Sequence, residues 1–267
     1  TRMTAEVNLE NVEKILYAYD SSDGDALNRV ASITKLFANQ RFIDFLSILV
    51  YFAYSEDAKS KGDLFCLRAA ITISAILNPQ TLQEKRNVRN AWVKAEPSIH
   101  ESIIGYVELG TEHSNEVMRN LSCRIFALIV SLNFDDFVEK SLKGMIERIQ
   151  NGSFAGIQIS SLLKIIVEIF EFPGSAIVRK TPQTTEVFHM AFCVCLRILS
   201  APLGEMNDNE GLTIRRLAVS ACRNILAHRY ISKDEQKDLI VNGSTSLFLG
   251  DVGLTQEILL LYFEIFK

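Results

Sequence analysis

Paired helical segments recur along the whole chain, and this repetition constrains the fold more than any other feature of the sequence. Within each segment, apolar residues return at three- and four-residue intervals, which is the spacing of one face of an α-helix. The segment from Ser114 to Leu132 is a clear example, with Val117, Leu121, Ile125 and Leu128 on one face. Polar turns separate the segments, so each pair is expected to form a helical hairpin.

Six such pairs are expected in the 267 residues of the chain. The resulting period of about 43 residues lies in the range of HEAT and armadillo repeats, ~40–47 residues. We therefore predict an all-α fold, a right-handed α-solenoid of about six HEAT-like hairpins that form a single domain. The predicted repeats span approximately residues 8–38, 41–77, 97–132, 134–171, 183–228 and 233–267.

Three stretches between the repeats are expected to differ from simple turns. Residues 80–92 are predicted to form a short connector helix, in which Lys85, Arg86 and Arg89 make either a basic patch or an ordinary solvated face. The polar stretch SEDAKSKGD is expected to be the loop of the second hairpin. Residues 172–185 contain two prolines and a glycine, and are predicted to be a long loop between repeats.

Composition excludes several classes of protein. Hydrophobic residues make up 48% of the chain, enough for a continuous core, while the net charge of −4 argues against nucleic-acid binding. No uncharged apolar run reaches the ~18 residues of a membrane span, so no membrane insertion is expected. The five cysteines show no disulfide-scaffold spacing, which favours a reducing compartment and small buried side chains. No metal site or cofactor is expected.

Motifs of catalysis were sought and are not expected to be present. The sequence contains no P-loop, no G-x-S-x-G and no H-E-x-x-H pattern. The paired carboxylates Asp135 and Asp136 precede a helical segment, where helix capping explains them. His189 lies in an apolar helical segment and His228 follows a helix end, which suits structural roles. We therefore predict that the chain is not an enzyme.

A resemblance to a known family rests on the stretch from Arg89 to Glu112. Here the only tryptophan, Trp92, lies in the connector, and it is followed by Tyr106-Val107 and by Leu109-Gly110-Thr111-Glu112. The segment resembles the N-terminal region of the importin-β (karyopherin-β) family, which has a tryptophan in the same connector and a similar Leu-Gly-Thr-Glu turn. The likeness runs with few gaps from about Val7 to Phe266.

This resemblance implies a role in nuclear transport. Family members are HEAT solenoids that shuttle between cytoplasm and nucleus through the nuclear pore, and their N-terminal repeats bind Ran-GTP and Phe-Gly repeats of nucleoporins. Importin-α or cargo is bound mainly by later repeats. Family chains are longer than this one, so the resemblance implies an N-terminal fragment or a shortened relative. The alternative is a HEAT or armadillo scaffold with no role in transport.

The resemblance also implies residues for two partner surfaces. The Phe-Gly pocket of the family lies between the first helices of the fifth and sixth repeats. Its positions match Phe188, His189, Phe192, Gln236, Leu239 and Ile240 in this chain. The alternative interpretation is that these residues pack the fifth repeat on the sixth. The matching positions of the Ran surface lack the family's charged pattern, and its candidates here are Ser74, Asn78 and Arg119.

Overall fold

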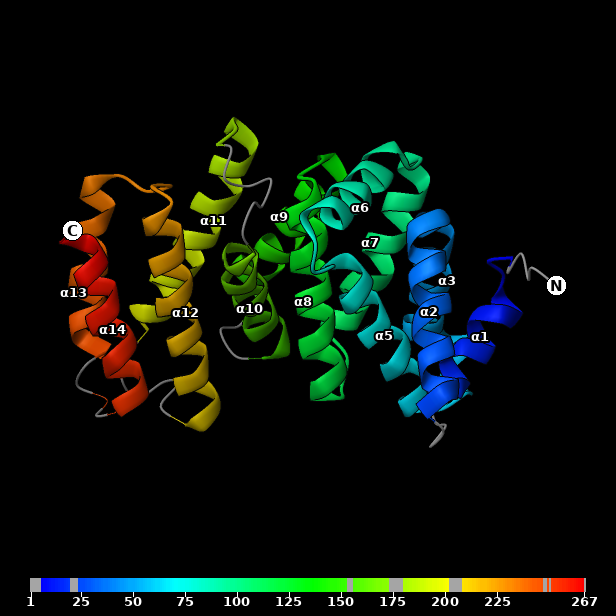
Figure 1. The fold of residues 1–267 in the computed structure, drawn as a ribbon. Helices are drawn as coiled ribbons and strands as arrows, with labels where there is room; N and C mark the ends of the chain where they lie inside the picture. The colour runs from blue at the N-terminus through cyan, green and yellow to red at the C-terminus, as the bar shows by residue number, and fades with distance from the viewer. Residues whose placement is uncertain are drawn as a thin grey trace. The chain divides into compact units, whose positions relative to one another are not determined.

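Helices are the regular secondary structure of the residues that the structure describes, joined by turns and short irregular segments. This computed structural model describes residues 6–19, 24–152, 156–172, 180–201, 208–246, 249 and 251–266, which form fourteen helices and no strand (Figure 1). The prediction of an all-α helical repeat is therefore confirmed. Contacts divide the chain into two compact units, Thr1–Asn133 and Phe134–Lys267. Among the described residues, no helix combines the length and apolar character needed to cross a membrane.

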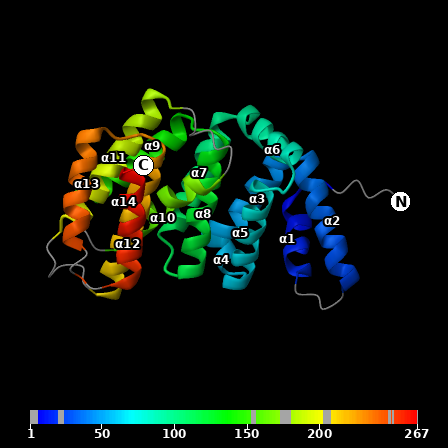
Figure 2. The same ribbon diagram turned by 60° about the vertical axis from the view of Figure 1, so that its left-hand side comes forward.

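The first unit contains three helical pairs and a connector. Its helices are α1 (Leu9–Ala18), α2 (Gly24–Gln40), α3 (Phe42–Tyr54), α4 (Glu56–Lys59), α5 (Asp63–Leu77), α6 (Leu82–Lys94), α7 (Pro97–Thr111) and α8 (Glu116–Leu132). Helix α3 packs on α5 within its own pair and on α7 of the next pair, while α5 packs on α8 (Figure 2). The hairpins therefore stack in two layers, as expected for helical repeats.

The connector helix α6 is anchored by the tryptophan that the sequence singles out. Trp92 is fully buried, and its ring stacks on that of His100 in α7, with centroids 4.3 Å apart and an interplanar angle of 9°. His100 Nε2 lies 2.8 Å from the carbonyl oxygen of Trp92, so the imidazole donates a hydrogen bond back to α6. Stack and hydrogen bond together fix the angle between α6 and α7.

The second unit contains three further pairs. Its helices are α9 (Asp136–Gln150), α10 (Ile157–Glu171), α11 (Pro182–Leu199), α12 (Asn209–Ala227), α13 (Lys233–Ser246) and α14 (Val252–Ile265). The first helices α9, α11 and α13 pack side by side in one layer, and the second helices α10, α12 and α14 in the other. This is the same two-layer stacking as in the first unit.

Helices α12 and α14 are joined by charged side chains as well as by apolar packing. Arg216 makes two hydrogen bonds to the Asp251 carboxylate, at 2.9 and 2.6 Å. Arg223 binds Glu257 at 3.0 Å. Because the earlier residue on α12 pairs with the earlier residue on α14, the two helices run parallel. Asp251 also accepts the backbone N–H of Leu254, so the same carboxylate caps α14.

A buried arginine closes the C-terminal end of α11. Arg215 on α12 is 0% exposed, and its guanidinium donates to the carbonyl oxygens of Leu199 at 3.4 Å and Ala201 at 3.0 Å. The last carbonyls of a helix have no intrahelical partner and carry partial negative charge. The positive side chain therefore satisfies groups that would otherwise be buried without a hydrogen bond.

Helix capping explains why the predicted start of α9 is correct and the predicted start of α11 is not. Asp135 accepts the backbone N–H groups of Phe137 and Val138, which confirms the capping role predicted for it. The predicted loop over residues 172–185 is wrong at its C-terminal end, because α11 begins at Pro182. Thr181 and Thr184 form a capping box there, and proline at the first helical position loses no hydrogen bond.

The second correction concerns SEDAKSKGD, which contains the short helix α4 rather than a simple loop. Ser55 caps α4 by accepting the backbone N–H of Ala58. Gly62 then adopts a φ of 97°, which reverses the chain into α5. Other predicted features fall partly outside the described residues, among them residues 173–179 of the predicted inter-repeat loop.

Candidate functional site

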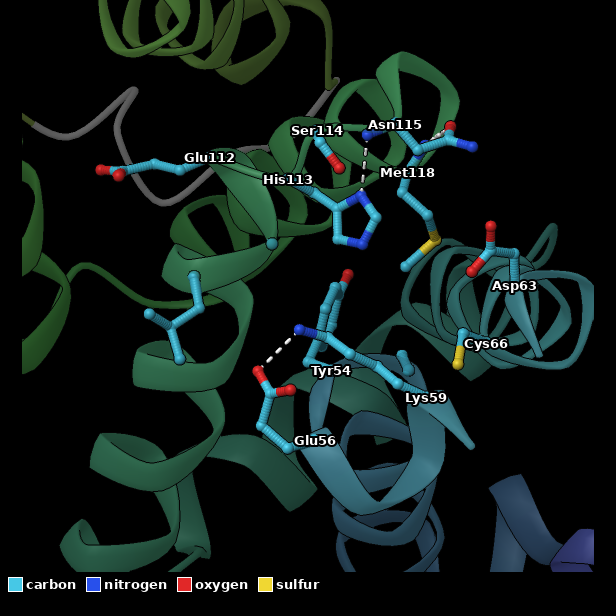
Figure 3. A pocket seen from close by; sticks show the side chains of 13 residues that line it. Tyr54, Glu56, Lys59, Asp63, Cys66, Glu112, His113, Ser114, Asn115 and Met118 are labelled. Carbon is cyan, nitrogen blue, oxygen red and sulfur yellow. Dashed lines mark hydrogen bonds and ion pairs between the residues drawn. The ribbon is translucent and has the colours of Figure 1, made fainter. Parts of the chain in front are cut away.

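A cleft opens in the first unit where two inter-helix turns meet. One turn joins α3 to α5 through α4, and the other joins α7 to α8 (Figure 3). The cleft has a volume of about 370 Å³. The cleft lies at the ends of four helices, so both polar turn residues and core side chains line it. Small binding sites commonly combine apolar walls with a few polar groups in this way.

Tyr54 forms the floor of the cleft together with Met118. Its hydroxyl lies 3.1 Å from Ser122 Oγ, which itself donates to the carbonyl oxygen of Met118 at 2.7 Å. Burial raises the pKa of Tyr54 above its ordinary value of 10.0, so the phenol stays protonated. The buried thiol of Cys66 is also part of this wall, and burial raises its pKa as well. Neither group is activated as a nucleophile.

Gly110 makes this floor possible. A Cβ atom at this position would lie 2.4 Å from Cε1 of Tyr54 and 2.5 Å from Ser122 Oγ. Carbon atoms in contact are normally separated by about 3.5–4.0 Å. Only glycine therefore lets the Tyr54 ring pack directly against the backbone of α7. This gives a structural reason for the glycine of the Leu-Gly-Thr-Glu sequence, whose first three residues form the end of α7 and not a turn.

Charged side chains line the rim of the cleft. Glu56 and Lys59 form an ion pair at 2.6 Å, and Asp63 and Glu112 are among the other lining residues, although the Glu112 side chain points away from the cleft (Figure 3). The His113 ring and the Tyr54 hydroxyl point toward the same space (Figure 3). Three of the lining residues carry a carboxylate and one carries an ammonium group, so the lining as a whole has more negative than positive side chains. The cleft therefore suits a cationic or hydrogen-bonding side chain of a partner.

The α7–α8 turn that carries His113 is held by its own hydrogen bonds. His113 Nδ1 accepts the backbone N–H of Asn115 at 3.0 Å, and a neutral ring therefore carries its proton on Nε2, toward the cleft. Asn115 caps α8 by accepting the N–H groups of Val117 and Met118. Arg119 donates to the carbonyl oxygen of His113 at 2.7 Å. The turn thus presents a fixed imidazole.

The cleft holds one imidazole, one ammonium group and a few carboxylates. Among the described residues, no three His, Cys, Asp or Glu side chains lie close enough to hold a metal ion. In the described part of the cleft, the imidazole is oriented by a backbone N–H and not by a carboxylate. A cleft of this size can receive one or two side chains of a protein partner.

The residues predicted for the Phe-Gly pocket lie on α11 and α13, which pack against each other. Phe188, Phe192 and Leu239 are 0% exposed, and Phe188 packs on Phe170 and Tyr230 with ring centroids 5.0 Å apart. These three side chains belong to the core of the second unit. A partner's ring could reach them only if the two helices separated.

The other three predicted pocket residues reach the surface of the same helices. His189 is 49% exposed, and its Nε2 lies 2.6 Å from the Glu235 carboxylate. The pKa of Glu235 is lowered, since hydrogen bonds from Ser232 and His189 outweigh the opposing effect of burial. Gln236 and Ile240 are half-buried. The structure thus brings all six residues onto neighbouring helices, and the pocket itself stays a prediction.

The three residues predicted for Ran do not form one cluster. Arg119 lies near the start of α8, directly after Met118, which lines the cleft together with Asp63 of α5. Ser74 lies eleven residues beyond Asp63 on α5, which corresponds to about 16 Å along a helix. Asn78 is the C-cap of α5, one turn further on. Ser74 and Asn78 therefore share one end of α5, and Arg119 lies at the other.

Sequence reasoning did not find the cleft itself. Its residues come from two turns that are more than forty residues apart, and no short motif links them. One available signal was Gly110, a glycine inside a helical segment, which is tolerated there only for a packing or functional reason.

Comparisons with known proteins provide no functional assignment. No protein-family model matches the sequence, and no curated protein matches it. Among solved structures, the chain is similar to two engineered proteins. One is 13% identical, with a TM-score of 0.46 over 96% of each chain. The other is 14% identical, with a TM-score of 0.47 over 97% of this chain and 58% of that chain, so this chain spans less than two thirds of its length.

Proposed function

We propose that the chain is a protein-binding helical-repeat module of the importin-β type, which binds Ran-GTP and Phe-Gly nucleoporin repeats during nuclear import. The observation that supports this proposal is the order of its helices around Trp92. Two helical pairs are followed by a connector helix whose buried tryptophan stacks on α7, the first helix of the next pair, and the Leu-Gly-Thr-Glu sequence lies at the end of α7. This is the order on which the resemblance rests. Cytoplasm and nucleus are the corresponding locations.

The chemistry of the surface is consistent with protein partners. The cleft between the two turns carries carboxylates, an imidazole and an ammonium group beside buried apolar side chains. A polar rim around apolar contact surface is typical of protein interfaces. Importin-α or cargo would bind through later repeats of a longer chain of this type.

A titration against Ran in its two nucleotide states tests the proposal. The purified chain is titrated with Ran loaded with a non-hydrolysable GTP analogue and, separately, with GDP. We expect binding to the GTP form only. Asn78→Ala should weaken this binding if the α5 end contributes to it. Arg119→Ala should weaken it if the cleft end contributes, with circular dichroism as the control for folding, since this change also removes the hydrogen bond to His113.

A Phe-Gly peptide titration tests the second predicted surface. His189→Ala and Gln236→Ala change side chains that reach the surface, and should weaken binding without disturbing the core. Asp238→Ala is the matched control, because Asp238 is also exposed on α13. Peptide binding that is unchanged in both variants would exclude this surface.

A helical-repeat scaffold without a transport role is the second candidate. The burial of Phe188, Phe192 and Leu239 favours it, because three of the six predicted pocket positions are occupied by core side chains. A scaffold of this kind binds a protein partner regardless of the nucleotide on Ran. Equal binding of the two Ran forms, or binding of neither, would favour it over the transport receptor.

A further inference from the structure

The connector helix α6 exposes a row of side chains that belongs to neither of the surfaces discussed so far. The row consists of Leu82, Arg86, Arg89 and Val93, and we call it the α6 basic face. At ~100° per residue, the four side chains fall within about 60° of one another. Leu82 is 77% and Val93 54% exposed, and both arginines are exposed. The helix lies between the second and third helical pairs, at the top of the first unit in Figure 2.

The two arginines of the α6 basic face have no acidic partner within the described part of the chain. Among the described residues, neither makes an ion pair or a hydrogen bond. The one acid on α6, Glu84, is engaged by Lys35 at 3.1 Å and by Thr81 at 2.8 Å. Other basic side chains of the first unit do pair with carboxylates, namely Lys14, Arg41, Lys59 and Lys61. The two guanidinium groups are therefore available to a group outside the chain.

The stability of α6 does not explain these charges. Lys85 precedes Arg89 by four residues and Arg86 precedes it by three, so three cations are neighbours on the helix surface. Like charges at these spacings destabilise a helix. The helix dipole favours a basic residue in the last turn, which accounts for Lys94 but not for Arg86 or Arg89. The positions of these two arginines therefore point to a role in binding.

Charge and spacing together define the partner that fits this face. A guanidinium group binds a carboxylate through two parallel hydrogen bonds, and arginine is enriched at the energetic centres of interfaces. Apolar side chains at both ends favour a partner that is apolar at both ends. A nucleic acid would gain contacts to the arginines but not to Leu82 and Val93, and the net charge of −4 opposes its approach. The face therefore suits an acidic protein segment.

We propose that the α6 basic face binds an acidic amphipathic helix of a partner protein. In a twelve-residue helical segment, carboxylates at the fifth and eighth positions face Arg86 and Arg89, and apolar residues at the first and twelfth face Leu82 and Val93. The face has the same spacing read from either end, so both directions of the partner helix fit. None of its residues belongs to the predicted Ran or Phe-Gly surfaces, so the inference is independent of the proposed function.

Fluorescence anisotropy with a synthetic helical peptide tests the proposal on the full chain. The labelled peptide carries leucine at positions 1 and 12 and glutamate at positions 5 and 8, with alanine and glutamine elsewhere. A control peptide of the same composition carries the glutamates at positions 3 and 10, on the opposite side of the helix. We expect the first peptide to bind at least about tenfold more tightly than the control. Added salt should weaken this binding, because it screens exposed charges.

Charge reversal locates the binding on α6. Arg86→Glu combined with Arg89→Glu should abolish binding of the glutamate peptide and create binding of a peptide with lysines at the same two positions. Arg29→Glu combined with Lys140→Glu is the matched control, because both residues are exposed and the net charge changes by the same amount. This control should bind the glutamate peptide as the unmodified chain does, and circular dichroism checks that both variants are folded.

A stability measurement separates a binding role from a structural one. Arg86→Gln combined with Arg89→Gln removes the repulsion within α6, so this variant should unfold at no lower urea concentration than the unmodified chain. A clear loss of stability would mean that the arginines are structural and would overturn the proposal. So would equal binding of the two peptides, binding of neither, or unchanged binding after charge reversal. A short DNA duplex that binds more tightly than the glutamate peptide, and only when the arginines are present, would assign the face to nucleic acid instead.

Discussion

Replacement of Gly110 by alanine tests the packing that forms the floor of the cleft. The new methyl group would lie 2.4 and 2.8 Å from two ring carbons of Tyr54 and 2.5 Å from Ser122 Oγ. Neither neighbour can easily yield. The Tyr54 ring is 8% exposed, and Ser122 is 0% exposed and hydrogen-bonded to Met118. Helix α7 must therefore shift relative to its neighbours, or the ring must leave its position.

The expected size of the effect follows from two opposing contributions. Adding a methylene to a well-packed core typically costs 1–3 kcal/mol, so the clash should cost about 2–3 kcal/mol. Alanine in place of glycine inside a helix contributes about 0.5–1 kcal/mol of stability. We expect a net loss of about 1–2 kcal/mol. Gly105 provides the control, because it lies on the same helix and a Cβ there would meet nothing within 4 Å.

Urea-induced unfolding followed by tryptophan fluorescence measures both variants. Trp92 is the only tryptophan and lies in the first unit, so its emission reports the unit that contains both glycines. Gly105→Ala should raise the free energy of unfolding by about 0.5–1 kcal/mol, and Gly110→Ala should lower it. The reasoning is refuted if Gly110→Ala is as stable as Gly105→Ala. Adding Tyr54→Leu to Gly110→Ala should cost less than the two changes separately.

Two further predictions concern the second unit. Arg215→Ala leaves a cavity and two buried carbonyl groups at the end of α11, and should lower stability by about 3 kcal/mol in thermal or urea unfolding; an effect as small as that of a surface substitution would contradict the capping role. Hydrogen bonds from Arg216 hold the pKa of Asp251 below its ordinary value of 3.8. A lowered carboxyl pKa stabilises the fold above the ordinary value, and this contribution is lost as the pH falls through the folded pKa. Asp251→Asn keeps the cap but removes the charge, so its deficit in stability should be present at neutral pH and should shrink as the pH falls below 3.8 and through the lowered pKa. A deficit that is independent of pH would contradict this origin.

The helices could be predicted because apolar spacing reports burial directly. Of the α8 residues that the spacing puts on one apolar face, Ile125 and Leu128 are buried and Leu121 is half-buried. Val117 is the exception: it lies in the first turn of α8 and is 59% exposed. The start of α11 was missed because Pro182 was interpreted as a breaker of regular structure. Its effect depends on whether it precedes a helix or interrupts one. Thr184, three residues after Thr181, was the signal that Pro182 begins a helix, because threonines at this spacing can form a capping box.

The candidate sites depend on contacts that the sequence does not encode locally. An aromatic residue on a helix gives the same pattern whether it packs in the core or lines a groove, so the burial of Phe188 and Phe192 could not be predicted. The cleft requires that the Tyr54 ring reach the backbone at Gly110, across two helices. Such an approach follows from three-dimensional packing, and only its individual residues are visible in the sequence.

The two ion pairs between α12 and α14 determine which turn of one helix faces which turn of the other. The pairs are separated by seven residues on α12 (216 to 223) and by six on α14 (251 to 257). Sliding one helix by a turn, about 5.4 Å, would separate both pairs at once. An apolar seam alone would tolerate such a slip far better. If another helical hairpin replaced the sixth one, α13–α14, it would need carboxylates at the positions of Asp251 and Glu257 to pack on α12 in the same register.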